Sequence, residues 1–151
     1  MTRILFVCHG NICRSPMAEF IMKQKVKERG IEKDFYIESA ATSTEELGNP
    51  VYPPVRNILE KRGINCAQKR ARQITRADYD RFDYIICMDS NNIRNLGRIL
   101  HNDNENKIYK LLSFAKIDRD VADPWYTRDF LKTEEDISIG CDALIHKIIG
   151  R

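Results

Sequence analysis

The chain has 151 residues, a length typical of one domain with a buried core, and we expect a single domain over residues 1–151. Its 25 Lys and Arg and 22 Asp and Glu side chains leave a formal net charge of +3, which predicts a mixed surface rather than the dense basic face that nucleic-acid binding needs. The apolar run near the N-terminus is too short for a signal-peptide core or a membrane span.

Short apolar runs and helical patterns alternate along the chain. The runs have the length of strands buried on both faces of a sheet, and they are Ile4–Cys8, Phe35–Ile37, Tyr84–Met88 and Ile108–Leu112. Strands that alternate with helices predict an α/β fold, here a small doubly wound sheet of about four parallel strands with helices on both faces. In such sheets, ligands bind beyond the carboxyl ends of the strands.

The first helix is expected after Pro16, with Ser15 as its capping residue, Pro16 at its first position and Gly30 at its end. Four further helices are expected from capping residues or from apolar residues at helical spacing. Their markers are Val55, Ile58 and Leu59 before Gly63; a capping box of Thr75 and Asp78; Ile93, Leu96 and Leu100; and Ile137, Cys141, Leu144, Ile145 and Ile148 before Gly150.

The loop after the first strand reads CHGNICRSP, from Cys8 to Pro16, and has the features of an anion site. Gly10 and Asn11 are residue types that tolerate left-handed backbone angles, so successive N–H groups can point inward. A concave group of inward-pointing N–H groups, together with the N-terminus of the following helix, binds anions. Arg14 adds a planar guanidinium that can donate to two phosphate oxygens at once. The loop therefore predicts a site for a phosphate-like dianion.

Cys8 lies in the same electrostatic field. Helix N-termini and nearby cations favour the thiolate over the thiol, and a thiolate beside a bound phosphoryl group is a nucleophile. Ser15 can donate a hydrogen bond to its sulfur. A lone cysteine is more often a small buried hydrophobic residue, but the surrounding loop residues favour the nucleophile here.

Asp123 is the candidate for a general acid. Expelling a phenolate, whose conjugate acid has a pKa of about 10, is slow unless a proton arrives with it. Pro124 restricts Asp123 to extended angles in the loop after the fourth strand, at the same sheet edge as Cys8. Trp125 and Tyr126 follow directly and offer an apolar wall for an aromatic ring. An Asp-Pro pair alone would favour a simple turn.

The motif C-x5-R-S, written here as CHGNICRSP, resembles the phosphate loop of the low-molecular-weight protein tyrosine phosphatases. The resemblance continues in order through ESAATS, ARQIT, FDYIICMD and DPW, and so covers most of the chain. It implies a phosphotyrosine hydrolase that works through a cysteinyl-phosphate intermediate with neither a metal nor another cofactor. Cys8, Arg14 and Asp123 are then the catalytic residues.

The resemblance also assigns the surrounding residues. The expected substrate-binding residues are His9, Gly10, Asn11, Ile12, Cys13, Ser15, Trp125 and Tyr126. Ser39 is expected to support the loop through a hydrogen-bond network. In the family this network usually includes a His, and this chain has Lys69 at that position. A Lys side chain donates hydrogen bonds but cannot accept them. Glu45 and Glu46 lie where some relatives carry an aromatic pocket wall, which argues against acidic phosphopeptides as substrates.

The five cysteines are scattered rather than arranged as a disulfide framework or as zinc-binding pairs, which indicates a reducing, cytoplasmic location. The resemblance implies that Cys13 traps oxidised Cys8 as a disulfide, with simple packing as the alternative. Cys66, Cys87 and Cys141 are expected in the core. The three histidines lack metal-ligand spacing, so no metal site is expected.

Three other functions remain open. A protein arginine phosphatase resembles the chain closely but has Thr where this loop has Ile12. A thiol-coupled arsenate reductase shares the loop but needs further cysteines, and Cys87 has no such partner close after it. A non-enzymatic anion-binding module would need neither Cys8 nor Asp123. The expected partners are phosphotyrosine-bearing proteins, with a cognate tyrosine kinase as a candidate and the chain as a monomer or weak dimer.

Overall fold

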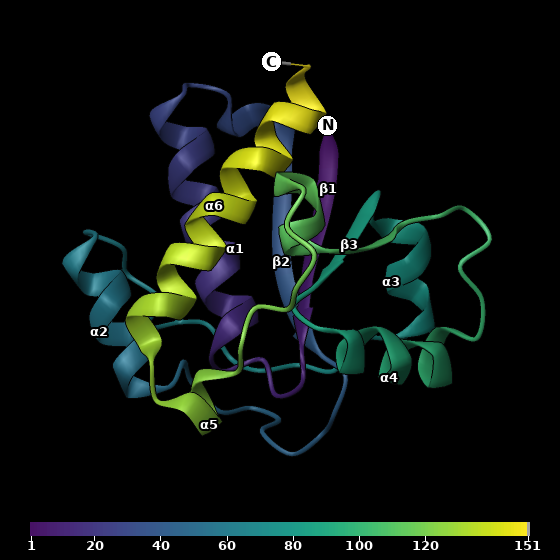
Figure 1. Ribbon diagram of the computed structural model, residues 1–151, viewed down its shortest axis with the longest axis horizontal. Helices are drawn as coiled ribbons and strands as arrows, with labels where there is room; N and C mark the ends of the chain where they lie inside the picture. Colours follow the sequence, from purple (N-terminus) through teal and green to yellow (C-terminus); the bar gives the residue numbers. More distant parts are fainter. Residues whose placement is uncertain (151) are drawn as a thin grey trace.

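The computed structural model describes residues 1–150 and contains one sheet of parallel strands (Figure 1). The strands are β1 (Thr2–Cys8), β2 (Phe35–Ala41), β3 (Tyr84–Cys87) and β4 (Ile108–Lys110). They lie in the order β2-β1-β3-β4, and every neighbouring pair is parallel. The predicted four-stranded parallel sheet is confirmed.

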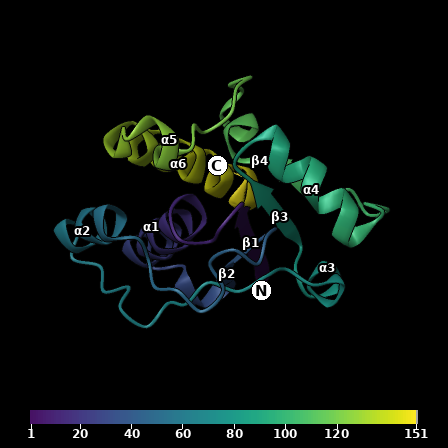
Figure 2. The ribbon, with the colours of Figure 1, turned by 90° about the horizontal axis from the view of Figure 1, so that it is seen from below.

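Helices cover both faces of the sheet, as predicted for a doubly wound fold. Figure 2 shows α1, α2 and α6 to one side of the sheet and α3 and α4 to the other. Their bounds are α1 (Arg14–Glu28), α2 (Pro53–Lys61), α3 (Arg76–Arg81), α4 (Ser90–Leu100) and α6 (Phe130–Ile149). Within the described residues, no helix is both long and apolar enough to cross a membrane.

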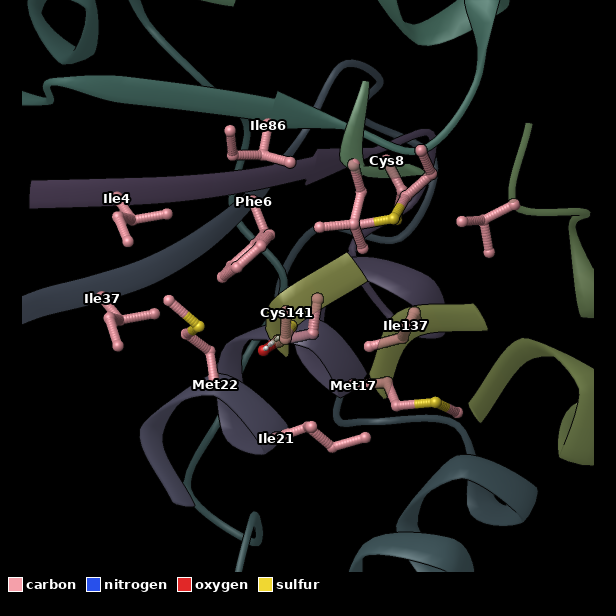
Figure 3. Packing of buried hydrophobic residues seen from close by; sticks show 14 of the residues in the cluster. Ile4, Phe6, Cys8, Met17, Ile21, Met22, Ile37, Ile86, Ile137 and Cys141 are labelled. Carbon is pink, nitrogen blue, oxygen red and sulfur yellow. Dashed lines mark hydrogen bonds between the residues drawn. The ribbon is translucent and has the colours of Figure 1, made fainter. Parts of the chain in front are cut away.

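Alternate residues of β1 enter two separate cores. Ile4 and Phe6 pack in the cluster that includes residues of α1 and α6, such as Met22 and Cys141 (Figure 3). Leu5 lies in a second cluster on the opposite face, and all these side chains are fully buried. Because successive side chains of a strand point to opposite faces, a strand covered on both sides needs a continuous apolar run.

Three short elements were not predicted: η1 (Glu32–Asp34), η2 (Leu111–Ala115) and α5 (Pro124–Thr127). The expected fourth strand ends two residues early, at Lys110, because Leu111 and Leu112 turn into η2 and are buried. Leu111 packs so closely on Gly140 of α6 that a Cβ at residue 140 would collide with its side chain. Packing against α6 thus decides where β4 ends.

The start of α1 differs from the prediction. The helix begins at Arg14 with Cys13 as N-cap, so Ser15 and Pro16 lie inside the first turn, and the prediction that Ser15 caps the helix is wrong. The Ser15 hydroxyl contacts the Cys8 sulfur instead. No side chain caps this N-terminus, so its first backbone N–H groups remain available to an anion. The predicted end at Gly30, which adopts a φ of 70°, is confirmed.

The other predicted helices are confirmed at α2, α3, α4 and α6, including the capping box of Thr75 and Asp78. The helix α6 starts earlier than its apolar pattern, at Phe130, and ends at Ile149 before Gly150. Cys8 ends β1, and Asp89 lies two residues after the end of β3. The parallel strands therefore bring these two residues to the same edge of the sheet.

Candidate active site

The loop between β1 and α1 folds around the sulfur of Cys8. The backbone N–H of Asn11 donates to Cys8 Sγ at 3.3 Å, and Asn11 adopts a φ of 60° in the left-handed region. Gly10 does not use that region, contrary to our expectation. A Cβ on Gly10 would lie 3.3 Å from the Cγ of Glu46, so close approach is what favours glycine here.

Asn11 and Ser15 determine how the sulfur is hydrogen-bonded. Ser15 Oγ lies 3.0 Å from Cys8 Sγ and accepts a hydrogen bond from Asn11 Nδ2 at 2.8 Å. The other acceptor near this hydroxyl, the carbonyl of Ala40, is 3.5 Å away. When Cys8 is a thiolate, the single hydroxyl proton of Ser15 can be donated to the sulfur.

A second layer supports Asn11 from behind. Asn11 Nδ2 also donates to Ser39 Oγ at 2.9 Å, and Ser39 Oγ donates to Glu19 Oε1 at 2.6 Å. Lys69 Nζ donates to the carbonyl of Ser39 at 2.9 Å and lies 3.6 Å from Glu19. Burial lowers the pKa of Lys69, and the negative charge of Glu19 opposes this effect. Lys69 therefore contacts the network through donation alone, and Glu19 supplies the acceptor.

Arg14 connects the loop to two other segments. Its guanidinium is almost fully buried and donates through Nη1 to Asp89 Oδ2 at 2.6 Å and to the carbonyl of Val121 at 2.8 Å. Nη2 lies 3.4 Å from Asp123 Oδ2. Burial alone would lower the pKa of Arg14, but the charges of Cys8, Asp89 and Asp123 outweigh it and raise the pKa. Arg14 thus stays charged beside the sulfur.

Asp123 lies directly before the short helix α5. Its geometry is compatible with both interpretations made from the sequence, a turn residue and a general acid. Its backbone is extended, as Pro124 requires, and its Oδ1 accepts a hydrogen bond from the N–H of Trp125 at 3.0 Å. Asp123 is therefore a capping residue, and its other carboxylate oxygen still faces Arg14. The two roles are compatible because a carboxylate has two oxygens.

One pocket contains most of the predicted site residues. Its lining residues are Cys8, His9, Gly10, Ile12, Cys13, Arg14, Glu45, Glu46, Asp123, Trp125 and Tyr126. Trp125 is 45% and Tyr126 81% exposed, so both project into solvent at its mouth. Asn11, Ser15 and Ser39 are not among the lining residues and act from behind the loop.

Two acidic residues, Glu45 and Glu46, form part of the pocket wall. Glu45 Oε2 is 2.9 Å from His9 Nε2, and both side chains are exposed. Glu46 accepts a hydrogen bond from Asn49 Nδ2 at 2.5 Å. This side of the pocket is therefore polar.

All five cysteines are buried free thiols. Burial, together with the charges of Cys8 and Asp123, raises the pKa of Cys13 far above the ordinary value. Cys66, Cys87 and Cys141 lie in the cores, as predicted. Across residues 1–150, no three His, Cys, Asp or Glu side chains are grouped so that they could hold a metal ion.

The structure adds residues that the sequence analysis missed or left without a role. Glu19, which was not predicted, accepts a hydrogen bond from Ser39. Asp89, for which the sequence predicts no catalytic role, caps α4 and accepts a hydrogen bond from Arg14. A clue to Glu19 exists in the sequence, because it lies among the buried apolar residues of α1, four positions after Ser15. No sequence feature indicates that the carbonyl of Val121 accepts a hydrogen bond from Arg14.

Comparisons with known proteins agree with this geometry. The family model of the low molecular weight phosphotyrosine protein phosphatases matches residues 3–150. The protein-tyrosine-phosphatase YfkJ of Bacillus subtilis is 39% identical over 150 residues, covering 98% of this chain and 96% of its own, and its crystal structure superposes with a TM-score of 0.95.

Two further solved structures are similar. SP-PTP, a low molecular weight protein tyrosine phosphatase from Streptococcus pyogenes, is 42% identical, with a TM-score of 0.87 over 97% of this chain and 93% of its own. DARP, a Drosophila arginine phosphatase, is 29% identical, with a TM-score of 0.88 over 98% of each chain. With the family model matching nearly every residue, the chain belongs to the low molecular weight phosphotyrosine protein phosphatase family.

Proposed function

We propose that this protein hydrolyses phosphotyrosine in proteins and small aryl phosphates through a cysteinyl-phosphate intermediate. One observation carries the proposal: the sulfur of Cys8, the guanidinium of Arg14 and the carboxyl group of Asp123 line a single pocket. These are the nucleophile, the phosphate ligand and the proton donor that the reaction needs.

In the first step, the Cys8 thiolate attacks phosphorus, so that a sulfur–phosphorus bond forms while the bond from phosphorus to the tyrosyl oxygen breaks. Asp123 gives its proton to the departing phenolate. Arg14 and the N–H groups of the loop hold the other phosphoryl oxygens, and the Ser15 hydroxyl steadies the sulfur.

In the second step, water attacks phosphorus and Asp123, now a carboxylate, takes up a proton from it. The sulfur–phosphorus bond breaks, which releases phosphate and restores the thiolate. The hydrogen bonds from Ser15 and from the N–H of Asn11 stabilise sulfur as the leaving group.

Substrate recognition is proposed to use the rest of the pocket. Trp125 and Tyr126 provide aromatic surface for the tyrosyl ring, and His9, Gly10, Ile12 and Cys13 line the remaining wall. Phosphoserine is shorter and lacks the ring, so its phosphorus cannot reach Cys8 while its ester oxygen meets Asp123. The polar wall at Glu45 and Glu46 disfavours acidic phosphopeptides.

We also propose that the chain acts in the cytoplasm as a single domain and as a monomer or weak dimer. Its partners are phosphotyrosine-bearing proteins, and a cognate tyrosine kinase supplies them. Activity is sensitive to oxidation through Cys8 and Cys13.

An arginine phosphatase is the second candidate, because a Drosophila arginine phosphatase shares the fold at a TM-score of 0.88. Steady-state turnover on matched phosphotyrosine, phosphoarginine and phosphoserine peptides separates the two, with arsenate and thiol donors as a further arm. We expect kcat/KM to be highest for phosphotyrosine, and no turnover by the Cys8→Ser protein. A higher kcat/KM for phosphoarginine would replace the proposal with the second candidate.

A further inference from the structure

The carboxylate of Asp123 has few polar contacts of its own. The helix α5 is a single turn of four residues. Within the described part of the chain, the Asp123 carboxylate makes two polar contacts: one with the N–H of Trp125 in its own turn, and one of 3.4 Å with Arg14. In the proposed reaction Arg14 also binds the phosphoryl group, so substrate competes for that contact. Other contacts must therefore fix Asp123.

Arg128 lies directly after α5, and its side chain contacts two aromatic rings. Its guanidinium carbon lies 5.5 Å from the ring centroid of Tyr52 and 5.1 Å from that of Phe130. Its Nη2 donates to the phenolic oxygen of Tyr52 at 3.2 Å. Arg128 adopts a φ of 60°, a region that favours glycine, so the side chain is present despite an unfavourable backbone conformation.

Tyr52 joins this segment to the phosphate loop. Its backbone N–H donates to the carbonyl of Ile12 at 2.9 Å. Its ring packs on Trp125, two residues after Asp123, with centroids 5.0 Å apart, and on Phe130 with centroids 6.1 Å apart. Tyr52 thus contacts the loop that holds the nucleophile, the helix α5 that follows the acid, and the first residue of α6.

We infer that Tyr52 and Arg128 form a clip that positions Asp123 relative to Cys8. They are positioning residues, and the inference rests on the proposed function of Asp123 as the proton donor. Proton transfer needs the donor within about 2.6–3.2 Å of the leaving oxygen, and a displacement of about 1 Å can cost on the order of 100-fold in rate. A clip anchored in the phosphate loop holds this distance while Arg14 is engaged by substrate.

The variant Arg128→Gly tests the clip without straining the backbone, because glycine readily adopts the left-handed angles found there. The two substrates are phenyl phosphate, whose leaving phenolate is basic, and p-nitrophenyl phosphate, whose leaving group needs less proton transfer. We expect kcat/KM, which reports formation of the cysteinyl phosphate, to fall about 10-fold on phenyl phosphate and about 3-fold or less on p-nitrophenyl phosphate, since only the first substrate depends strongly on the acid.

Three further variants define the effect. Lys116→Gly is the matched control, because Lys116 is an exposed cation that also has a φ of 60° but does not line the pocket. It should leave both rates unchanged. Arg128→Lys keeps a cation and should recover part of the loss on phenyl phosphate. In an Asp123→Ala background, Arg128→Gly should cause no further loss that depends on the leaving group.

Hydrogen exchange gives a readout independent of activity. Loss of the clip should speed amide exchange at Trp125–Arg128 in the Arg128→Gly protein and leave β1 unchanged, with the free energy of unfolding equal to or above that of the wild type. Equal loss of kcat/KM on both substrates, or unchanged exchange at this segment, would overturn the inference. A wild-type protein that hydrolyses neither aryl phosphate would refute the proposed function instead, and exchange would still show whether the clip exists.

Discussion

The hydroxyl of Ser15 lies 3.0 Å from the sulfur of Cys8 and is the donor of this hydrogen bond whenever the sulfur is a thiolate, because a thiolate carries no proton. Asn11 Nδ2 donates to the same hydroxyl oxygen and so holds it beside the sulfur. A hydrogen bond to a charged group contributes about 1.5–3 kcal/mol. Because sulfur regains its charge when the intermediate is hydrolysed, we expect this bond to act mainly on that step.

The variant Ser15→Ala should therefore reduce kcat by about 10- to 100-fold, and a phosphorylated enzyme should accumulate. Rapid-quench measurement of the burst with p-nitrophenyl phosphate checks this. A burst equal to that of the wild type, followed by an unchanged steady-state rate, would show that the bond does not assist hydrolysis.

Lys69 should be needed for the shape of the loop. In Lys69→Met, the carbonyl of Ser39 loses its donor and the buried Glu19 loses a nearby cation, and we expect the free energy of unfolding to fall by about 1–3 kcal/mol and kcat to fall more than KM rises. Lys23→Met is the control, because Lys23 also pairs with Glu19 but is 45% exposed, and it should cost about 1 kcal/mol or less. Urea denaturation and steady-state kinetics measure both. Equal effects of the two substitutions would contradict the role of Lys69.

Cys13 should protect Cys8 from irreversible oxidation. Burial raises the pKa of Cys13, so it remains a thiol at neutral pH, and peroxide should react first with Cys8. We expect a Cys8–Cys13 disulfide that thiols reverse, and irreversible inactivation of the Cys13→Ser protein. Peptide mass mapping decides: a sulfinic or sulfonic Cys8 beside a free Cys13 thiol would mean that Cys13 only packs.

Ile12 should contribute to the preference for tyrosine. Its branched side chain lines the pocket and would crowd a guanidinium, whereas the smaller, polar threonine leaves room for one. We expect Ile12→Thr to raise kcat/KM for phosphoarginine peptides relative to phosphotyrosine peptides. An unchanged or lower ratio would place the discrimination elsewhere in the pocket.

Asp78 should make stability depend on acid pH. Burial alone would raise its pKa, but hydrogen bonds from Arg72 and from the N–H of Thr75 hold the pKa below the ordinary value. Its contribution to stability is therefore complete above the unfolded-state pKa of about 3.9 and is lost as the pH falls through the lower folded-state value.

The free energy of unfolding of the wild type should consequently decline below about pH 5, and Asp78→Asn should flatten this decline. Asp80→Asn, an exposed position on the same helix, is the control. Urea denaturation across the acid range measures the slopes. An Asp78→Asn protein with the wild-type acid slope would show that other carboxylates dominate.

The sequence by itself determined the sheet, most helices and the phosphate loop. Apolar runs of strand length between helical patterns are local features, and so is a loop in which Cys8, Asn11 and Arg14 lie within seven consecutive positions. A contiguous motif keeps its own residues close whatever the rest of the chain does. Asp123 was also predicted, because the carboxyl ends of parallel strands share an edge.

Only the tertiary structure decided which distant residues complete the site. Asp89 is 75 residues from Arg14, and Lys69 is 30 residues from Ser39. Tyr52 is 76 residues from Arg128. Such contacts depend on the strand order β2-β1-β3-β4 and on how the helices pack, which no local pattern encodes. For Ser15, the contact with the Cys8 sulfur was predicted from the loop and is confirmed, whereas the cap predicted from its position before Pro16 is wrong because α1 begins at Arg14.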